Sequence, residues 1–139
     1  MKYYLLILIM TLSSMDMSAM PETQVHKNDT IYSDPEQFLK NLYTDYVFGN
    51  KNFKKIKSHF SKKIIKKLTD SYSYDGKGYA TWLFRTGYQD GPSDISSVYE
   101  IIPEAQNWFR VTYSDMGHLG VTRFKVKMIG ERVFIDDFQ

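Results

Sequence analysis

The stretch that decides the fold is VTRFKVKMI, residues 121–129, in which Phe124, Val126 and Met128 alternate with basic residues. Successive side chains of a β-strand point to opposite faces. A period of two therefore places the apolar side chains on one face and the charged ones on the other. The pattern predicts a strand that is covered on one side and exposed to solvent on the other.

Three neighbouring stretches have the same character. Residues 96–102 and 132–138 are rich in β-branched and aromatic residues, and residues 108–113 again alternate apolar with polar side chains. Gly117 and Gly130 lie between these stretches, where tight hairpin turns favour glycine. The closing third of the chain is therefore predicted to form a four-stranded antiparallel sheet.

Residues 34–48 are predicted to form an amphipathic helix. Ser33 and Asp34 both suit its N-cap, and Pro35 falls in its first turn. Apolar side chains recur three to four positions apart, which makes one broad stripe: Phe38, Leu39, Leu42, Tyr43, Tyr46 and Val47. Gly49 follows at the position where a left-handed C-cap is expected.

Residues 51–68 predict two shorter helices. The first presents Phe53, Ile56 and Phe60 on one side, and Ser61 caps the second. The apolar residues of the second are Ile64, Ile65 and Leu68. Helices followed by a meander of strands indicate an α+β fold. We expect N-terminal helices packed on a curved four-stranded antiparallel sheet.

The last predicted strand carries a family resemblance. Its sequence VFIDDF, residues 133–138, is similar to the final strand of nuclear-transport-factor-like (cystatin-like) domains, where an apolar or Trp residue precedes Ile-Asp-Asp. The resemblance spans residues 33–139 and implies a cone-shaped fold. Because that fold hosts enzymes, ligand carriers and interaction modules, it does not by itself assign a function.

More narrowly, the chain resembles an uncharacterised family of exported bacterial proteins. The dipeptide Gln89-Asp90 is similar to the Gln-Asp element of that family. The chain departs from the wider pattern at Val133, where Trp is common, and in the Tyr-rich residues 72–88. These departures concern the mouth of the implied cone.

The start of the chain has the layout of a secretory signal peptide. One basic residue precedes the apolar run of residues 5–12, and small polar residues follow it up to Ala19. The run is shorter than the roughly 20 residues of a membrane-spanning helix. We expect a signal peptide at residues 1–19, a mobile leader at 20–32 and a single domain at 33–139. The mature protein is then periplasmic or secreted, with no membrane span.

The amino-acid composition excludes several kinds of functional site. The chain contains no cysteine, so lipidation at a thiol, cysteine catalysis and thiolate metal sites are excluded. No metal or cofactor is expected. The formal net charge is only +2, which argues against a nucleic-acid partner.

A run of lysines is the first candidate binding surface. Residues 46–69 contain eight lysines and no acid. Lys62, Lys63, Lys66 and Lys67 fall on the polar side of the second short helix. They either form a solvated helix face or bind an acidic partner.

Aromatic residues form the second candidate. Tyr79, Trp82, Phe84 and Tyr88 lie in a Tyr- and Gly-rich segment, where they either fill the core or line the mouth of a pocket. Asp137 and Asp136 are weaker, catalytic candidates. An inward carboxylate with a raised pKa could act as a general base, as in ketosteroid isomerase-like enzymes, and Asp137 shares the face of the apolar strand residues.

The histidines suggest no site. We expect His59 to be half-buried and His118 to lie at a hairpin tip near Asp115, but two ligands do not make a metal site. The leading hypothesis is an exported, non-enzymatic binding or interaction module for an unknown protein or small ligand, with an inhibitor or immunity-type role as one version. The alternatives are a small pocket enzyme that uses one buried carboxylate, and a homodimeric structural protein.

Overall fold

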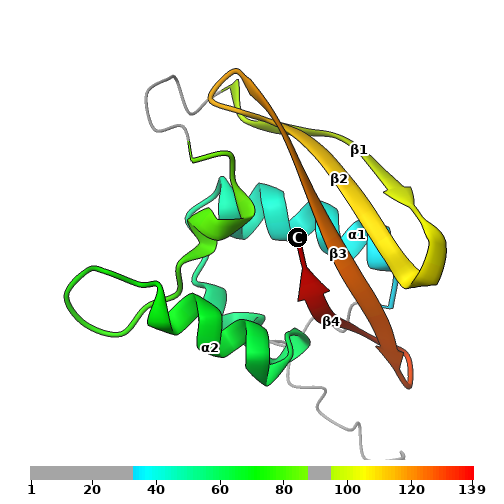
Figure 1. Ribbon diagram of the computed structural model, residues 1–139, viewed down its shortest axis with the longest axis horizontal. Coiled ribbons are helices and arrows are strands. Elements are labelled where there is room, and N and C mark those ends of the chain that lie inside the picture. Colours follow the sequence, from blue (N-terminus) through cyan, green and yellow to red (C-terminus); the bar gives the residue numbers. More distant parts are fainter. Residues whose placement is uncertain (1–32, 88–94) are drawn as a thin grey trace, which may run out of the picture.

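The computed structural model describes residues 33–87 and 95–139, and it has an α+β architecture. Helices and helical turns come first along the chain, and the four strands of one antiparallel sheet follow. Figure 1 shows the helical half lying against one side of the twisted sheet. The predicted fold class is therefore confirmed. The expected signal peptide and leader, as well as Gln89-Asp90, lie outside the described residues.

The first helix is shorter and less regular than its sequence predicts. Helix α1 spans Pro35–Asn41, and the side chain of Asp34 accepts a hydrogen bond from the backbone N–H of Glu36 as its N-cap. The chain then widens into a π-helical segment, η1, Leu42–Val47, in which the N–H of Phe48 bonds the carbonyl of Tyr43. Five residues of the predicted apolar stripe are buried, and the sixth, Tyr46, is partly buried.

The expected left-handed cap at Gly49 is wrong. Gly49 does not have a positive φ. The residue is tightly packed instead, because a Cβ there would lie 2.5 Å from the carbonyl oxygen of Asp45. Glycine is required here by the close approach of two backbones rather than by backbone conformation.

The next segment contains two helical turns and one α-helix. The turns are η2, Phe53–Lys55, and η3, Lys57–His59. Helix α2 spans Lys62–Asp70, and the Oγ of Ser61 accepts a hydrogen bond from the N–H of Ile64, as its sequence predicts. Turn η4, Thr81–Phe84, follows the loop after α2.

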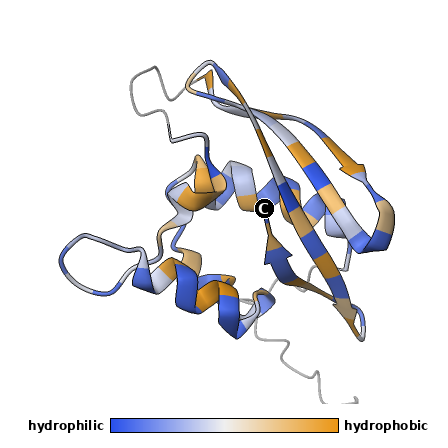
Figure 2. Ribbon diagram, viewed as in Figure 1, coloured by the Kyte–Doolittle hydropathy of each residue, from blue (hydrophilic) through white to orange (hydrophobic). Residues whose placement is uncertain are grey.

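The sheet has the strand order β1-β2-β3-β4. Its strands are β1 (Ser97–Pro103), β2 (Trp108–Asp115), β3 (His118–Ile129) and β4 (Arg132–Phe138), with the turn η6 (Ala105–Asn107) between β1 and β2. Gly117 and Gly130 have φ of +85° and +61° at the two hairpin turns, which confirms their predicted role. Figure 2 shows the predicted alternation as orange and blue bands along β2 and β3.

Aromatic side chains fill the space between the helices and the sheet. Tyr43, Phe84, Phe124 and Tyr113 are almost completely buried, and their rings contact one another. Helix α1 contacts β1, and α2 contacts β4. Without disulfides, the described domain relies on this packing, since large rings bury much apolar area.

Candidate functional site

One candidate site is a pocket beside the loop that follows α2. Its volume is about 460 Å³, within the range of about 300–1,000 Å³ that is usual for small-ligand sites. We call it the basic pocket. Its lining residues are Lys54, Lys57, Thr69, Tyr72, Gly76, Lys77, Gly78 and Tyr79.

Three lysines give this pocket a positive charge. Lys54 and Lys57 come from η2 and η3, and Lys77 comes from the loop after α2. Among residues 33–87 and 95–139, none of the three ammonium groups forms an ion pair. The lining residues include no carboxylate. The pocket therefore favours an anionic ligand.

Two tyrosines give the pocket an aromatic wall. Tyr79 packs on the core, with its ring centroid 5.1 Å from that of Phe53. Tyr72 covers the backbone at Gly78, where a Cβ would lie 2.3 Å from the Tyr72 ring. A side chain at position 78 would displace this ring, so the glycine shapes the wall.

A neighbouring pocket extends the basic pocket toward η1. The two share Lys54, Tyr72, Lys77, Gly78 and Tyr79. The extension adds Lys51, whose ammonium lies 2.7 Å from the carboxylate of Asp45. Its charge is thus offset, and the uncompensated part of the site stays at Lys54, Lys57 and Lys77.

The lysines of α2, predicted as a binding surface, lie outside this pocket. Lys66 forms an ion pair with Asp70, and Lys63 lies 3.0 Å from the carboxylate of Asp137 on β4. The ammonium of Lys67 lies 4.5 Å from the ring centroid of Phe138. Lys62 is exposed on the same helix. Most of this helix face is therefore engaged within the domain.

The weak catalytic candidates Asp136 and Asp137 line neither the basic pocket nor its extension. The register between β3 and β4 shifts at Lys125/Val126, so that Asp137 pairs with Lys125 while Ile135 pairs with Val126. Asp136 is exposed. The Lys63 ammonium lowers the pKa of Asp137 below its ordinary value. The expectation that Asp137 has a raised pKa, as a general base requires, is therefore wrong.

The four aromatic residues that were predicted to form one binding surface do not lie together in one site. Tyr79 lines the basic pocket, and Trp82 lines a second pocket described below. Phe84 has no exposed surface and stacks on Phe60, so it belongs to the core and the predicted binding role is wrong. Tyr88 lies outside the described residues.

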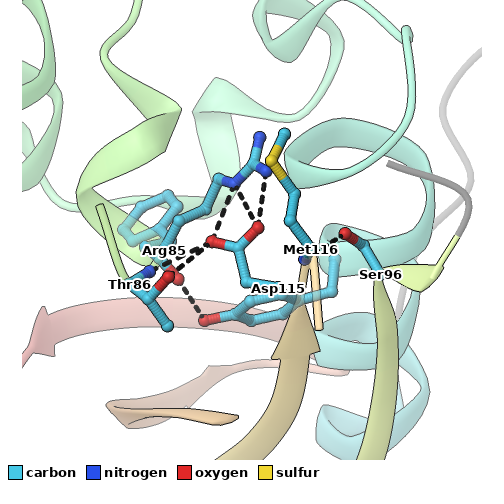
Figure 3. Close-up of polar contacts among 7 residues, drawn as sticks. Arg85, Thr86, Ser96, Asp115 and Met116 are labelled. Atoms are coloured by element: carbon cyan, nitrogen blue, oxygen red, sulfur yellow. Dashed lines mark hydrogen bonds and ion pairs between the residues drawn. The ribbon is translucent and has the colours of Figure 1, made fainter. Parts of the chain in front are cut away.

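A buried ion pair is the main feature that sequence patterns did not reveal. Asp115, at the end of β2, has a fully buried side chain that accepts hydrogen bonds from Arg85 and from the N–H and Oγ of Thr86. Figure 3 shows Arg85 and Thr86 converging on this carboxylate. Burial acts to raise the pKa of Asp115, but these hydrogen bonds outweigh it, and its pKa is lowered.

The polar side chains of the core form a network close to this pair. The hydroxyl of Tyr43 donates to the carbonyl of Phe84 at 2.8 Å, and the hydroxyls of Tyr113 and Thr122 lie 3.0 Å apart. Burial raises the pKa of Tyr43 well above its ordinary value. Tyr43 is therefore a permanent donor that fixes η4 to η1.

The histidines have structural positions. His59 is more buried than expected, and its Nδ1 lies 2.8 Å from the carbonyl oxygen of Val133. His118 pairs with Asp115 in the β2–β3 register and is exposed, while the Asp115 side chain points to Arg85. Within the described residues, no group of three or more metal-ligating side chains lies together.

The outer face of the sheet is mixed in character. Arg123 and Arg110 lie 2.7 and 3.8 Å from Glu104, while Leu119 and Val121 are exposed farther along β3. The mixed character of this face does not test the predicted homodimer, which stays a prediction. In the described part of the chain, no helix is long and apolar enough to span a membrane.

Comparison with known proteins identifies no family. No protein-family model matches the chain, and no curated protein matches it. Among solved structures, the chain is similar to a protein of unknown function from Bacteroides thetaiotaomicron. The identity is 18%, the match covers 74% of this chain and 86% of that chain, and the TM-score is 0.47. This likeness assigns no function.

Proposed function

We propose that the domain is a non-enzymatic binding module that holds a small anionic ligand in the basic pocket. One observation carries this proposal: Lys54, Lys57 and Lys77 surround a tyrosine-walled pocket with no acid partner among the described residues. Like charges that face one cavity repel one another, and an anion relieves that repulsion. Binding of an anion therefore gives a reason for the three lysines to line the same pocket.

The tyrosines indicate the remainder of the ligand. Tyr72 and Tyr79 present ring surface beside the lysines, and such surface favours contact with a flat or apolar group. The hydroxyl of Thr69 donates to the carbonyls of Ile65 and Lys66 within α2, so it is available to a ligand only as an acceptor. A ligand that joins an anionic group to a ring would use both parts of the pocket.

The pocket offers little for acid–base catalysis. Its lining has no carboxylate and no histidine, the side chains that most often act as general base. The two aspartates of β4 lie elsewhere, and the pKa of Asp137 is lowered. These features favour a binding module over the enzyme alternative.

The test is calorimetric titration with phenyl phosphate, with inorganic phosphate and phenol as partial probes. Replacing Lys54, Lys57 and Lys77 together by Gln should weaken phenyl phosphate binding by about tenfold or more, because charge-assisted hydrogen bonds are lost. The matched control replaces Lys62, Lys63 and Lys66 by Gln, which removes the same charge from α2. Its affinity should stay within about twofold of the wild type, since exposed charges are screened.

Two results would contradict the proposal. Equal losses in both triple variants would show a response to net charge rather than to the pocket. Binding of inorganic phosphate as tight as that of phenyl phosphate would remove the role of the tyrosine wall. Melting curves of both variants confirm that each is folded.

We further propose that the domain is exported and has the nuclear-transport-factor-like fold. The layout of residues 1–19 supports export, and helices followed by an antiparallel meander support the fold. Mass spectrometry of the protein from the source cells, after fractionation, tests export. An uncleaved chain in the cytoplasm would contradict it.

A further inference from the structure

A second pocket lies beside the buried ion pair, on the other side of the aromatic segment from the basic pocket. Its volume is about 380 Å³, again in the usual range for small ligands. We call it the arginine pocket. It is lined by Ser71, Ser73, Tyr74, Trp82, Arg85, Gly87 and Met116.

Three aromatic rings separate the two pockets. Trp82 stacks on Tyr72 with ring centroids 5.7 Å apart, and Tyr74 meets Trp82 edge-on at 5.8 Å. Tyr72 lines the basic pocket, whereas Tyr74 and Trp82 line the arginine pocket. Tyr74 is 67% exposed. This exposed ring is held by two aromatic neighbours, Trp82 and Tyr72, and it provides a contact surface for a ligand.

Arg85 provides hydrogen-bond donors whose direction is fixed. Its Nε and Nη2 donate to Asp115, which is fully buried, while the Arg85 side chain is 22% exposed. The remaining nitrogen, Nη1, points away from Asp115 in Figure 3. A buried ion pair contributes little net stability on its own, but it holds this guanidinium in one orientation.

Met116 completes this side of the pocket in an unusual backbone conformation. Its φ is +51°, in the left-handed region that non-glycine residues rarely adopt. The N–H of Met116 donates to the Oγ of Ser96 at 2.9 Å, which helps to hold that conformation. Figure 3 shows the Met116 side chain beside the Arg85 guanidinium. A two-residue hairpin turn of type I′ requires a positive φ at both of its central residues, so the turn between β2 and β3 accounts for this conformation.

The charge of this pocket differs from that of the basic pocket. Arg85 is the only charged residue in the described lining, and Asp115 neutralises it. Within the described residues, the pocket therefore presents oriented N–H donors, two serine hydroxyls and aromatic surface, and its charges balance. These groups suit a neutral, polyhydroxylated ring: its hydroxyls bond the donors, and its C–H face packs on an aromatic ring.

We propose that the arginine pocket binds a neutral sugar unit, with Tyr74 and Trp82 as the packing surface and Arg85 as the oriented donor. The site is separate from the basic pocket, so it does not depend on the proposed anion binding. A carboxylate ligand is the competing possibility, because arginine also binds carboxylates.

The chain has two tryptophans, which provide an internal control. Trp82 lines the arginine pocket, whereas Trp108 lies on β2, with the Arg123 guanidinium 5.1 Å from its ring centroid. The ¹⁵N-labelled protein should be titrated with the methyl pyranosides of glucose, galactose, mannose and N-acetylglucosamine, and separately with benzoate. At least one pyranoside should shift the Trp82 indole N–H signal and leave that of Trp108 in place.

A matched pair of variants tests the packing surface. Tyr74→Ala should weaken pyranoside binding about fivefold, as expected for the loss of one aromatic contact. Tyr99→Ala is the control, because Tyr99 is 64% exposed and lies on β1 outside the pocket; its affinity should be unchanged. Arg85→Lys keeps the charge but loses the planar donors, and should also weaken binding.

Three outcomes would overturn the proposal. One is an unshifted Trp82 signal with every pyranoside at its highest soluble concentration. Another is a shift with benzoate alone, which would assign the pocket to a carboxylate. The third is an equal effect of Tyr74→Ala and Tyr99→Ala. The triple Gln variant of the basic pocket should retain sugar binding, which keeps the two proposals separable.

Discussion

Two groups of lysines in one chain meet different surroundings. On α2, Lys63 and Lys66 pair with acids, and Lys67 lies over the Phe138 ring. In the basic pocket, Lys54, Lys57 and Lys77 face a cavity, and none forms an ion pair with the described residues. A run of lysines in a sequence does not by itself define a binding site. The lysines that pair with acids in the folded domain are less available to an anionic ligand than those that do not.

The largest expected effect comes from changing the shape of the pocket without changing its charge. Gly78→Ala would place a Cβ 2.3 Å from the Tyr72 ring. The clashing atoms are the far end of a partly exposed side chain that can move, so the free energy of unfolding should fall by only about 1 kcal/mol, and the main effect is on the shape of the pocket. Phenyl phosphate binding should fall as well, although all three lysines remain. Urea unfolding and calorimetry measure the two effects.

Gly130→Ala is the control for this variant. Gly130 has φ of +61° in the β3–β4 turn and open space around its Cβ position. The substitution should cost about 1 kcal/mol in stability through backbone strain alone. Its ligand affinity should stay at the wild-type value; a parallel loss of affinity would mean that Gly78 acts only through stability.

A smaller effect is expected when the α2 lysines lose their acids. The double variant Asp70→Asn with Asp137→Asn leaves Lys63 and Lys66 unpaired. Each lost pair should cost less than about 1 kcal/mol, as is usual for exposed ion pairs. The variant should elute from a cation-exchange column at higher salt than wild type, since the helix face gains accessible charge.

The matched variant for this experiment is Glu36→Gln with Glu131→Gln. It changes the net charge by the same amount at two exposed acids that form no ion pair among the described residues. If both double variants elute at the same salt concentration, the ion pairs on α2 do not affect how strongly its lysines bind the column. The difference between paired and unpaired lysines would then have no effect on anion binding.

The smallest effect is the pH dependence of the same contact. The Lys63 ammonium lowers the pKa of Asp137 below its ordinary value in the folded state, and an unfolded Asp has a pKa of about 3.9. The stabilisation is therefore fully present above about pH 4 and disappears as pH falls through the folded pKa. Because Asp137 is 36% exposed, we expect less than about 0.5 kcal/mol.

Carbon-detected NMR titration of Asp137 measures this shift directly. Lys63→Gln should return the pKa toward its ordinary value, because the nearby ammonium is removed. If the pKa of Asp137 in the wild type lies at or above the ordinary value, the contact with Lys63 does not persist in solution. Lys63 would then lack an acid partner, as the lysines of the basic pocket do among the described residues.

Local features of the fold were predictable because their causes lie within a few residues. Ser61 caps α2 through the N–H three residues later, and the alternation buries Phe124 and Val126 on one face of β3. It fails at Met128, which is exposed near the end of the strand. The π-helical segment at Leu42–Val47 and the register shift at Lys125/Val126 were not predictable. Both depend on how neighbouring elements pack, and spacing alone favours the regular helix and strand.

The candidate sites show the same division. The sequence by itself determined that the chain has no thiol chemistry, an aromatic-rich loop, a lysine run and an α+β order of elements. Only the tertiary structure decided that Asp137 pairs with Lys63, that Asp115 holds Arg85, and which lysines remain around a pocket. The reason is physical: charge and burial depend on contacts between residues far apart in the chain, and these exist only once the sheet has closed over the helices.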